Sequence, residues 1–160
     1  MNIWKKVLGI SLAVGLSVGI SIAPVYADTT SILDEITDEE TTEDYAEDTS
    51  TILARSSYLN FGNATIKKVA SNEIIISGLT QCHRKCSKVY LSIYLERKVN
   101  GSYGTYKYWN FTANNATKLS IEIDVAVPSG TYYRVRGYHA ASQSGKKEST
   151  STLTSGIMVK

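Results

Sequence analysis

Two cysteines, Cys82 and Cys86, enclose the most reactive short segment of this chain, Cys-His-Arg-Lys-Cys. The segment contains His83, and His139 is the only other histidine. The N-terminus carries an export signal, and an even number of cysteines in an exported chain predicts a disulfide. The alternative is a zinc site, because the Cys-x3-Cys spacing suits zinc and both histidines could converge on it. The oxidising compartment favours the disulfide, so we expect no metal and no other cofactor.

Glu122 and Asp124 form a carboxylate pair whose spacing could suit a hydrolase. On one strand face they would lie about 7 Å apart. Alternating acidic residues on an exposed strand are more often solvated surface. The sequence contains no Gly-rich phosphate loop, no Gly-x-Ser-x-Gly elbow and no His-Glu-x-x-His motif. We therefore expect no catalytic residues and no enzymatic activity.

Tyrosine and arginine recur at alternate positions of three predicted strands and form the candidate binding residues. Tyrosine combines a large contact area with a hydroxyl group, and arginine stacks on rings and binds anions, so interfaces are enriched in both. If the three strands are neighbours, these side chains share one outer face. The alternative is that cross-strand tyrosine and arginine pairs only stabilise a solvent-facing sheet. The candidate residues are Tyr90, Tyr94, Tyr106, Tyr108, Tyr132, Arg134, Arg136 and Tyr138.

Most of these residues should lie on strands, because apolar and polar residues alternate almost throughout residues 51–160. The pair Asn100-Gly101 predicts a type I′ hairpin, which needs positive φ at both positions. Seven strands separated by turn signals, with no helical periodicity, indicate an all-β antiparallel sandwich. The predicted strands lie at residues 58–61, 73–80, 88–97, 105–112, 118–127, within 127–141, and at 148–159.

The last third of the chain resembles the F and G strands of fibronectin type III modules, part of the wider immunoglobulin-like class. The resemblance rests on Pro128, Gly130, Thr131, Tyr133, Val135, Arg136 and Ala140. It implies that Tyr133 bonds back to the backbone and pins two sheets together. Pro128 lies five residues before Tyr133 where the family usually has four, so Tyr132 is the alternative corner residue.

The whole chain is also similar to small secreted proteins of Gram-positive bacteria that are classed as a domain of unknown function. That similarity rests on the strand at 91–97, the Asn100-Gly101 turn and residues 132–137. It implies an extracellular location and no particular activity.

Residues 1–27 have the pattern of a signal peptide. Lys5 and Lys6 precede an apolar run, and Val25-Tyr26-Ala27 provides a small-residue cleavage site. The alternative is an uncleaved anchor, because the run is nearly long enough to span a bilayer. We expect cleavage before Asp28, secretion, and no transmembrane segment in the mature chain.

Residues 28–50 contain ten Asp and Glu residues and no Lys or Arg. Such a segment buries too little apolar surface to fold alone, so we expect a disordered acidic leader before a domain at 51–160. The domain has fifteen Lys and Arg residues against five Asp and Glu. This asymmetry bears on partners rather than on the fold.

Two functions are compatible with these features. The first is a secreted, non-catalytic module that binds an extracellular protein, a peptide or a cell-wall polymer through the tyrosine and arginine residues. The second is a polyanion-binding or small effector domain that its acidic leader masks. Salt distinguishes them, because attraction to a polyanion falls steeply with ionic strength.

Overall fold

The structure is a computed structural model that describes residues 40–51 and 56–160. Within these residues every regular element is a strand, which confirms the predicted all-β class. None of them forms a helix long and apolar enough to cross a membrane. The strands are β1 (Glu40–Thr41), β2 (Tyr45–Thr51), β3 (Leu59–Ala70), β4 (Glu73–Val99), β5 (Ser102–Ala126), β6 (Thr131–Gln143), β7 (Lys146–Leu153) and β8 (Gly156–Val159).

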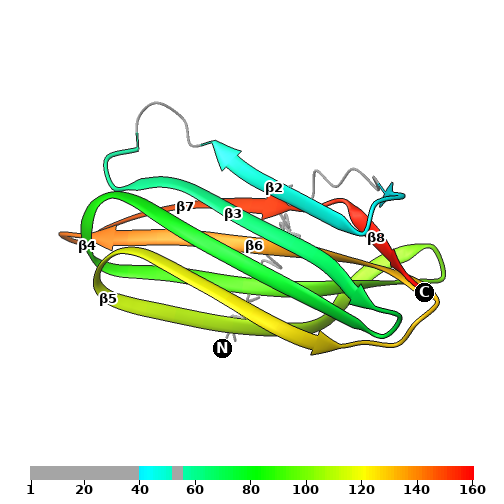
Figure 1. The fold of residues 1–160 in the computed structure, drawn as a ribbon. Helices are drawn as coiled ribbons and strands as arrows, with labels where there is room; N and C mark the ends of the chain where they lie inside the picture. The colour runs from blue at the N-terminus through cyan, green and yellow to red at the C-terminus, as the bar shows by residue number, and fades with distance from the viewer. Residues whose placement is uncertain (1–39, 52–55) are drawn as a thin grey trace, which may run out of the picture.

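The eight strands form one sheet that folds back on itself into two facing layers and nearly closes into a barrel (Figure 1). The strand order is β1-β8-β6-β4-β3-β2, with β5 also pairing with β4 and β7 with β6. The first layer contains β2, β3, residues 73–81 of β4 and residues 118–126 of β5. The second contains the remaining parts of β4 and β5 with β6, β7, β8 and β1. Because β1 and β8 are parallel, the predicted purely antiparallel arrangement is wrong at this edge.

Strands β4 and β5 each replace two strands that the sequence predicts. The predicted strands at 73–80 and 88–97 are joined in β4, and those at 105–112 and 118–127 are joined in β5. No glycine or proline lies between the members of either pair, so the chain bends without leaving the sheet.

The bend of β4 is a bulge that begins at Cys82 and ends at Cys86. Gln81 pairs with Lys118, but the next pair is Cys86 with Ala116, so β4 has extra residues that find no partner on β5. On β5 the bend coincides with Asn115, whose φ of 52° is left-handed. The predicted loop between two strands is therefore a bulge within one strand.

The core fills the space between the layers, and its members on β4 and β5 are those that the alternation predicts. The layers lie close together at Gly78, where a Cβ atom would lie 2.5 Å from Cδ1 of Ile93. A larger residue there would force the layers apart. The buried inward side chains of these two strands and the next turn include Ile74, Ile76, Val89, Leu91, Ile93, Leu95, Val125 and Val127.

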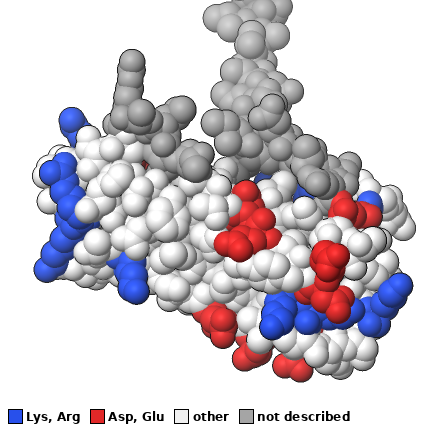
Figure 2. Space-filling view, turned by 45° about the horizontal axis from the view of Figure 1, so that its top comes forward, with Lys and Arg blue, Asp and Glu red and all other residues white. Residues whose placement is uncertain are grey.

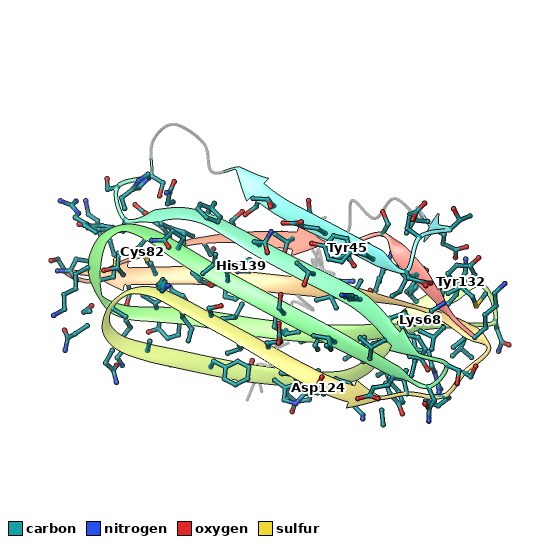
Figure 3. The ribbon with its side chains drawn as sticks, viewed as in Figure 1. Tyr45, Lys68, Cys82, Asp124, Tyr132 and His139 are labelled. Atoms are coloured by element: carbon teal, nitrogen blue, oxygen red, sulfur yellow. The ribbon has the colours of Figure 1, made fainter. Side chains whose placement is uncertain are left out.

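His139 also lies between the layers (Figure 3). Its Nδ1 is 3.0 Å from the hydroxyl of Thr80, and its Nε2 is 2.9 Å from the hydroxyl of Thr152. Burial lowers the pKa of His139 to about 4, although a backbone hydrogen bond at Leu79 opposes this shift. The imidazole is therefore neutral at pH 7 and bridges the two layers.

Two predicted turn features are confirmed. The hydroxyl of buried Tyr133 donates to the backbone carbonyl of Pro128 over 2.8 Å, as the corner assignment requires. Asn100 and Gly101 have φ angles of 52° and 87°, as a type I′ turn requires.

Two carboxylates tie β7 to the edge of the first layer. The backbone amide of Leu153 donates to Asp48 over 2.7 Å. Glu148 accepts from the hydroxyl of Ser56 and from three backbone amides, those of Ser57, Tyr58 and Leu59. Burial alone would raise the pKa of Glu148, but these donors lower it to about 2. Carboxylates therefore close this side of the barrel.

The prediction that residues 28–50 form a disordered leader is wrong for residues 40–50. Strand β2 is an ordered edge of the first layer, and its Ala46 side chain is buried in the core. Pairing with β3 satisfies its backbone, so the segment folds despite its charge. The expected signal peptide and residues 28–39 lie outside the described residues.

Candidate binding surface

Five of the predicted binding residues lie together on the outer side of the second layer. Tyr94 pairs with Tyr108 on β5 and with Arg136 on β6, so all three side chains point the same way. The rings of Tyr94 and Tyr108 stack, with centroids 6.2 Å apart and planes inclined by 22°. We call this surface the tyrosine face and define it by Tyr90, Tyr94, Tyr108, Arg136 and Tyr138.

Lys147 of β7 connects two tyrosines of this face. Its Nζ lies 4.7 Å from the ring centroid of Tyr90 and 5.6 Å from that of Tyr138. An ammonium group at these distances is attracted by the rings. The tyrosine face thus combines aromatic rings with exposed positive charge, as Tyr108 is 64% exposed and Lys147 is exposed.

A buried ion cluster supports one end of the tyrosine face. Glu96 accepts from Nε of Arg134 at 2.7 Å and from Nη2 of Arg136 at 2.5 Å. The guanidinium of Arg134 is buried and lies 3.9 Å from the ring centroid of Tyr103. Arg134 is thus part of the support for this surface, and the prediction that it is an exposed contact residue is wrong.

A shallow pocket of about 190 Å³ opens on the tyrosine face beside this cluster. Its lining residues are Tyr94, Glu96, Thr105, Arg136 and Tyr138. The pocket therefore combines two aromatic walls, the hydroxyl of Thr105, the guanidinium of Arg136 and the carboxylate of Glu96, which is already paired with two arginines.

Two other predicted residues lie elsewhere. The register slips between Leu95 and Glu96, which leaves Tyr106 opposite no residue of β4. Tyr106 therefore packs on the core, with its ring edge against Tyr133, and its predicted place on the outer face is wrong. Tyr132 lies at the far end of the sheet, where Nζ of Lys98 is 5.9 Å from its ring centroid.

Glu96, Tyr103 and Lys147 also belong to this surface, although the sequence pattern does not predict them there. The Asn100-Gly101 turn contained a signal for Tyr103. A two-residue hairpin sets the register of its strands, and this register places Tyr103 opposite Lys98. The burial of Glu96 depends on two arginines of another strand, which the alternation within one strand does not show.

Cys82 and Cys86 are both buried at the bend of β4, and the structure differs from the predicted disulfide in recording them as free thiols (Figure 3). Burial, the neighbouring thiol of Cys86 and the charge of Glu148 together raise the pKa of Cys82 to about 12. The two thiols are neighbours, as a disulfide between them would require. The disulfide therefore stays a prediction.

The alternative zinc site finds no support in the geometry. Both ring nitrogens of His139 face threonine hydroxyls, and His83 is exposed. No group of three His, Cys, Asp or Glu residues that could hold a metal occurs in residues 40–51 and 56–160.

Glu122 and Asp124 lie exposed on the outer side of the first layer. Their partners on β4 are Ser77 and Ile75, so the pair lies on an open sheet surface. This placement is that of solvated carboxylates.

Lys and Arg side chains gather at the end of the molecule where β4 bends and β6 turns into β7 (Figure 2). The nearby carboxylate of Glu148 is occupied by backbone donors. At the other end, basic and acidic side chains are interspersed. We call the first region the basic end and define it by the exposed residues Arg84, Lys85, Lys88, Lys118, Lys146 and Lys147.

The fold and this surface define a small all-β protein with one tyrosine-rich outer sheet face. The chain belongs to the Family of unknown function (DUF6147), whose model matches residues 32–157. No curated protein matches the chain. Among solved structures, the crystal structure of chicken MD-1 complexed with lipid IVa is similar over 71% of this chain and 91% of that chain, with 11% identity and a TM-score of 0.32.

Proposed function

We propose that this protein is a secreted, non-catalytic module that binds a protein, a peptide or a cell-wall glycan through the tyrosine face. The observation that carries the proposal is the unequal distribution of tyrosine between the two outer sides of the folded sheet. The outer side of the first layer, which we call the opposite face, has one tyrosine among the described residues, Tyr45 at its β2 edge. Its other residues include Thr49, Phe61, Asn63, Thr65, Lys67, Ile75, Ser77, Leu79, Ser120 and Glu122.

This distribution argues against sheet stabilisation as the sole role of the tyrosines. Strand propensity favours tyrosine equally on any half-buried sheet surface. On the opposite face, Ile75 and Leu79 flank Ser77, whose hydroxyl bonds that of Thr65 at 2.6 Å, so this sheet surface forms without a cluster of tyrosines. Tyrosine enrichment on one face only is typical of an interface.

A pelleting assay with purified Gram-positive cell walls tests the proposal. The double variant Tyr108→Ala/Tyr138→Ala should lose at least tenfold in wall affinity, because exposed aromatic residues dominate such contacts. The matched control Thr65→Ala/Ser77→Ala changes the opposite face and should bind as the unaltered protein does. Equal binding by both variants would refute the tyrosine face as the binding surface for walls.

The basic end favours a second candidate function, the binding of a polyanion. Six exposed cations from three strands could follow a flexible anionic chain. Retention on heparin at two salt concentrations separates the candidates, because this binding should vanish at high salt whereas aromatic contacts persist. Masking by residues 28–39 remains part of this second proposal, whereas β2 has a structural role.

The proposed location and ancestry rest on sequence features. The signal-peptide pattern of residues 1–27 supports secretion, and the turn and strand similarities support a Gram-positive origin. The bond from Tyr133 to Pro128 supports a fibronectin-like sandwich as the finer description of the fold.

A further inference from the structure

We infer that the pocket on the tyrosine face binds an acidic sugar, a single sugar ring that carries a carboxylate or another anionic substituent. This inference rests on the proposed binding function and names the ligand class for the same face. It follows from the charge, the unused donors and the size of the pocket.

The buried cluster beneath the pocket has one more positive than negative charge. Arg134 and Arg136 share the single carboxylate of Glu96, and each oxygen of that carboxylate serves one arginine. The three charges therefore sum to plus one, and an anion at the pocket would compensate this net charge.

The same two arginines have donors without acceptors. Within the described part of the chain, Nη1 of Arg134 and Nε of Arg136 are buried and make no hydrogen bond. The Arg136 side chain is 21% exposed, so ligand reaches this guanidinium rather than that of Arg134. Buried polar groups are rarely left unpaired, so the single carboxylate of Glu96 does not satisfy these two guanidinium groups completely.

The remaining walls suit a sugar ring. The rings of Tyr94 and Tyr138 provide apolar surfaces, and the hydroxyls of both tyrosines and of Thr105 provide polar partners. The volume of about 190 Å³ is below the roughly 300–1,000 Å³ of pockets for drug-sized ligands, so a single ring is the fitting unit. Because the pocket opens on a sheet face, further units of a polymer could extend across it.

Titration of the full mature chain, with residue-resolved NMR signals, tests the inference. The probes are D-glucuronate, glucose 6-phosphate, D-glucose and inorganic phosphate. We expect glucuronate or glucose 6-phosphate to shift the signals of Tyr94, Arg136 and Tyr138, with at least tenfold higher affinity than glucose or phosphate alone. The preferred acidic sugar identifies the anionic group.

The variant Arg136→Gln should lower acidic-sugar affinity at least tenfold and leave glucose affinity unchanged. Lys67→Gln, which removes an exposed cation from the opposite face, is the matched control and should bind as the unaltered protein does. Equal affinity for glucuronate, glucose 6-phosphate and glucose, or unchanged binding by Arg136→Gln, would overturn the inference. Wall binding that depends on Tyr108 but not on Arg136 would overturn it while leaving the proposed function intact.

Discussion

The two outer faces of the folded sheet are both built from β-strands, but they carry different side chains. The tyrosine face presents stacked rings, exposed cations and a pocket above buried charges. The opposite face mixes apolar side chains such as Ile75 and Leu79 with polar ones that pair with one another, as Asn63 does with Thr49 and Glu47. Both faces belong to long strands that pass through both layers, β4 and β5. Strand formation alone therefore does not account for the difference between the two faces.

Removing the carboxylate beneath the tyrosine face should have the largest effect on stability. Glu96→Gln leaves the buried Arg134 and the half-buried Arg136 without a negative partner, so the free energy of unfolding should fall by about 3 kcal/mol. On the opposite face, the matched variant Glu122→Gln should change it by less than about 0.5 kcal/mol. Denaturant melts measure both, and equal values would contradict the different roles of the two faces.

Acid should weaken the interior that both faces share. The pKa of His139 is about 4 in the folded chain and near 6.5 when unfolded, so the unfolded state binds the proton first as the pH falls. Stability should decrease between pH 6.5 and 4.5, by up to about 1.4 kcal/mol per pH unit. Glu148 adds its own loss only below about pH 4.5, because its stabilisation is present above the unfolded pKa and is lost toward pH 2.

Melts of the unaltered chain and of His139→Gln at several pH values test this. The variant should be less stable at pH 7 and should have a flatter profile between pH 6.5 and 4.5. A slope as steep as that of the unaltered chain would assign the pH dependence to another group.

The two thiols at the β4 bend should be oxidised in protein recovered from culture medium. A loop this short constrains the unfolded chain little, so reduction should cost about 2 kcal/mol or less. Mass spectrometry after thiol alkylation counts the free thiols. Two alkylated cysteines would contradict the predicted disulfide.

The corner between the layers offers the smallest expected effect. Tyr133→Phe removes the hydrogen bond to Pro128 and should lower stability by about 1 to 2 kcal/mol. Tyr138→Phe removes a hydroxyl from the tyrosine face and should change stability little. Equal losses in the two variants would argue against a structural corner at Tyr133.

The sequence was sufficient to predict the inward residues of β4 and β5, because strict alternation determines which side of a strand faces the core. It misplaced Tyr106 because Tyr106 is itself an extra residue of β5 without a partner on β4, so the strict alternation breaks there. Such bulges depend on pairing with a distant strand, which a local pattern does not contain.

The acidic strand β2 was missed for a related reason. Ala46 is its one apolar residue in the core, and pairing with β3 together with the bond from Leu153 to Asp48 holds the strand in place. Composition alone indicates that this segment cannot fold by itself. It does not reveal that the segment can become an edge strand once the rest of the sheet has formed.

Hydrogen exchange with and without solubilised Gram-positive wall fragments tests the central claim most directly, because it observes both faces in one experiment. If the tyrosine face binds, added fragments should slow exchange in residues 105–112 of β5 and 134–140 of β6. Residues 61–67 of β3 and 118–124 of β5, which underlie the opposite face, should exchange at unchanged rates. Slower exchange on the opposite face alone, or no change in either, would contradict the account.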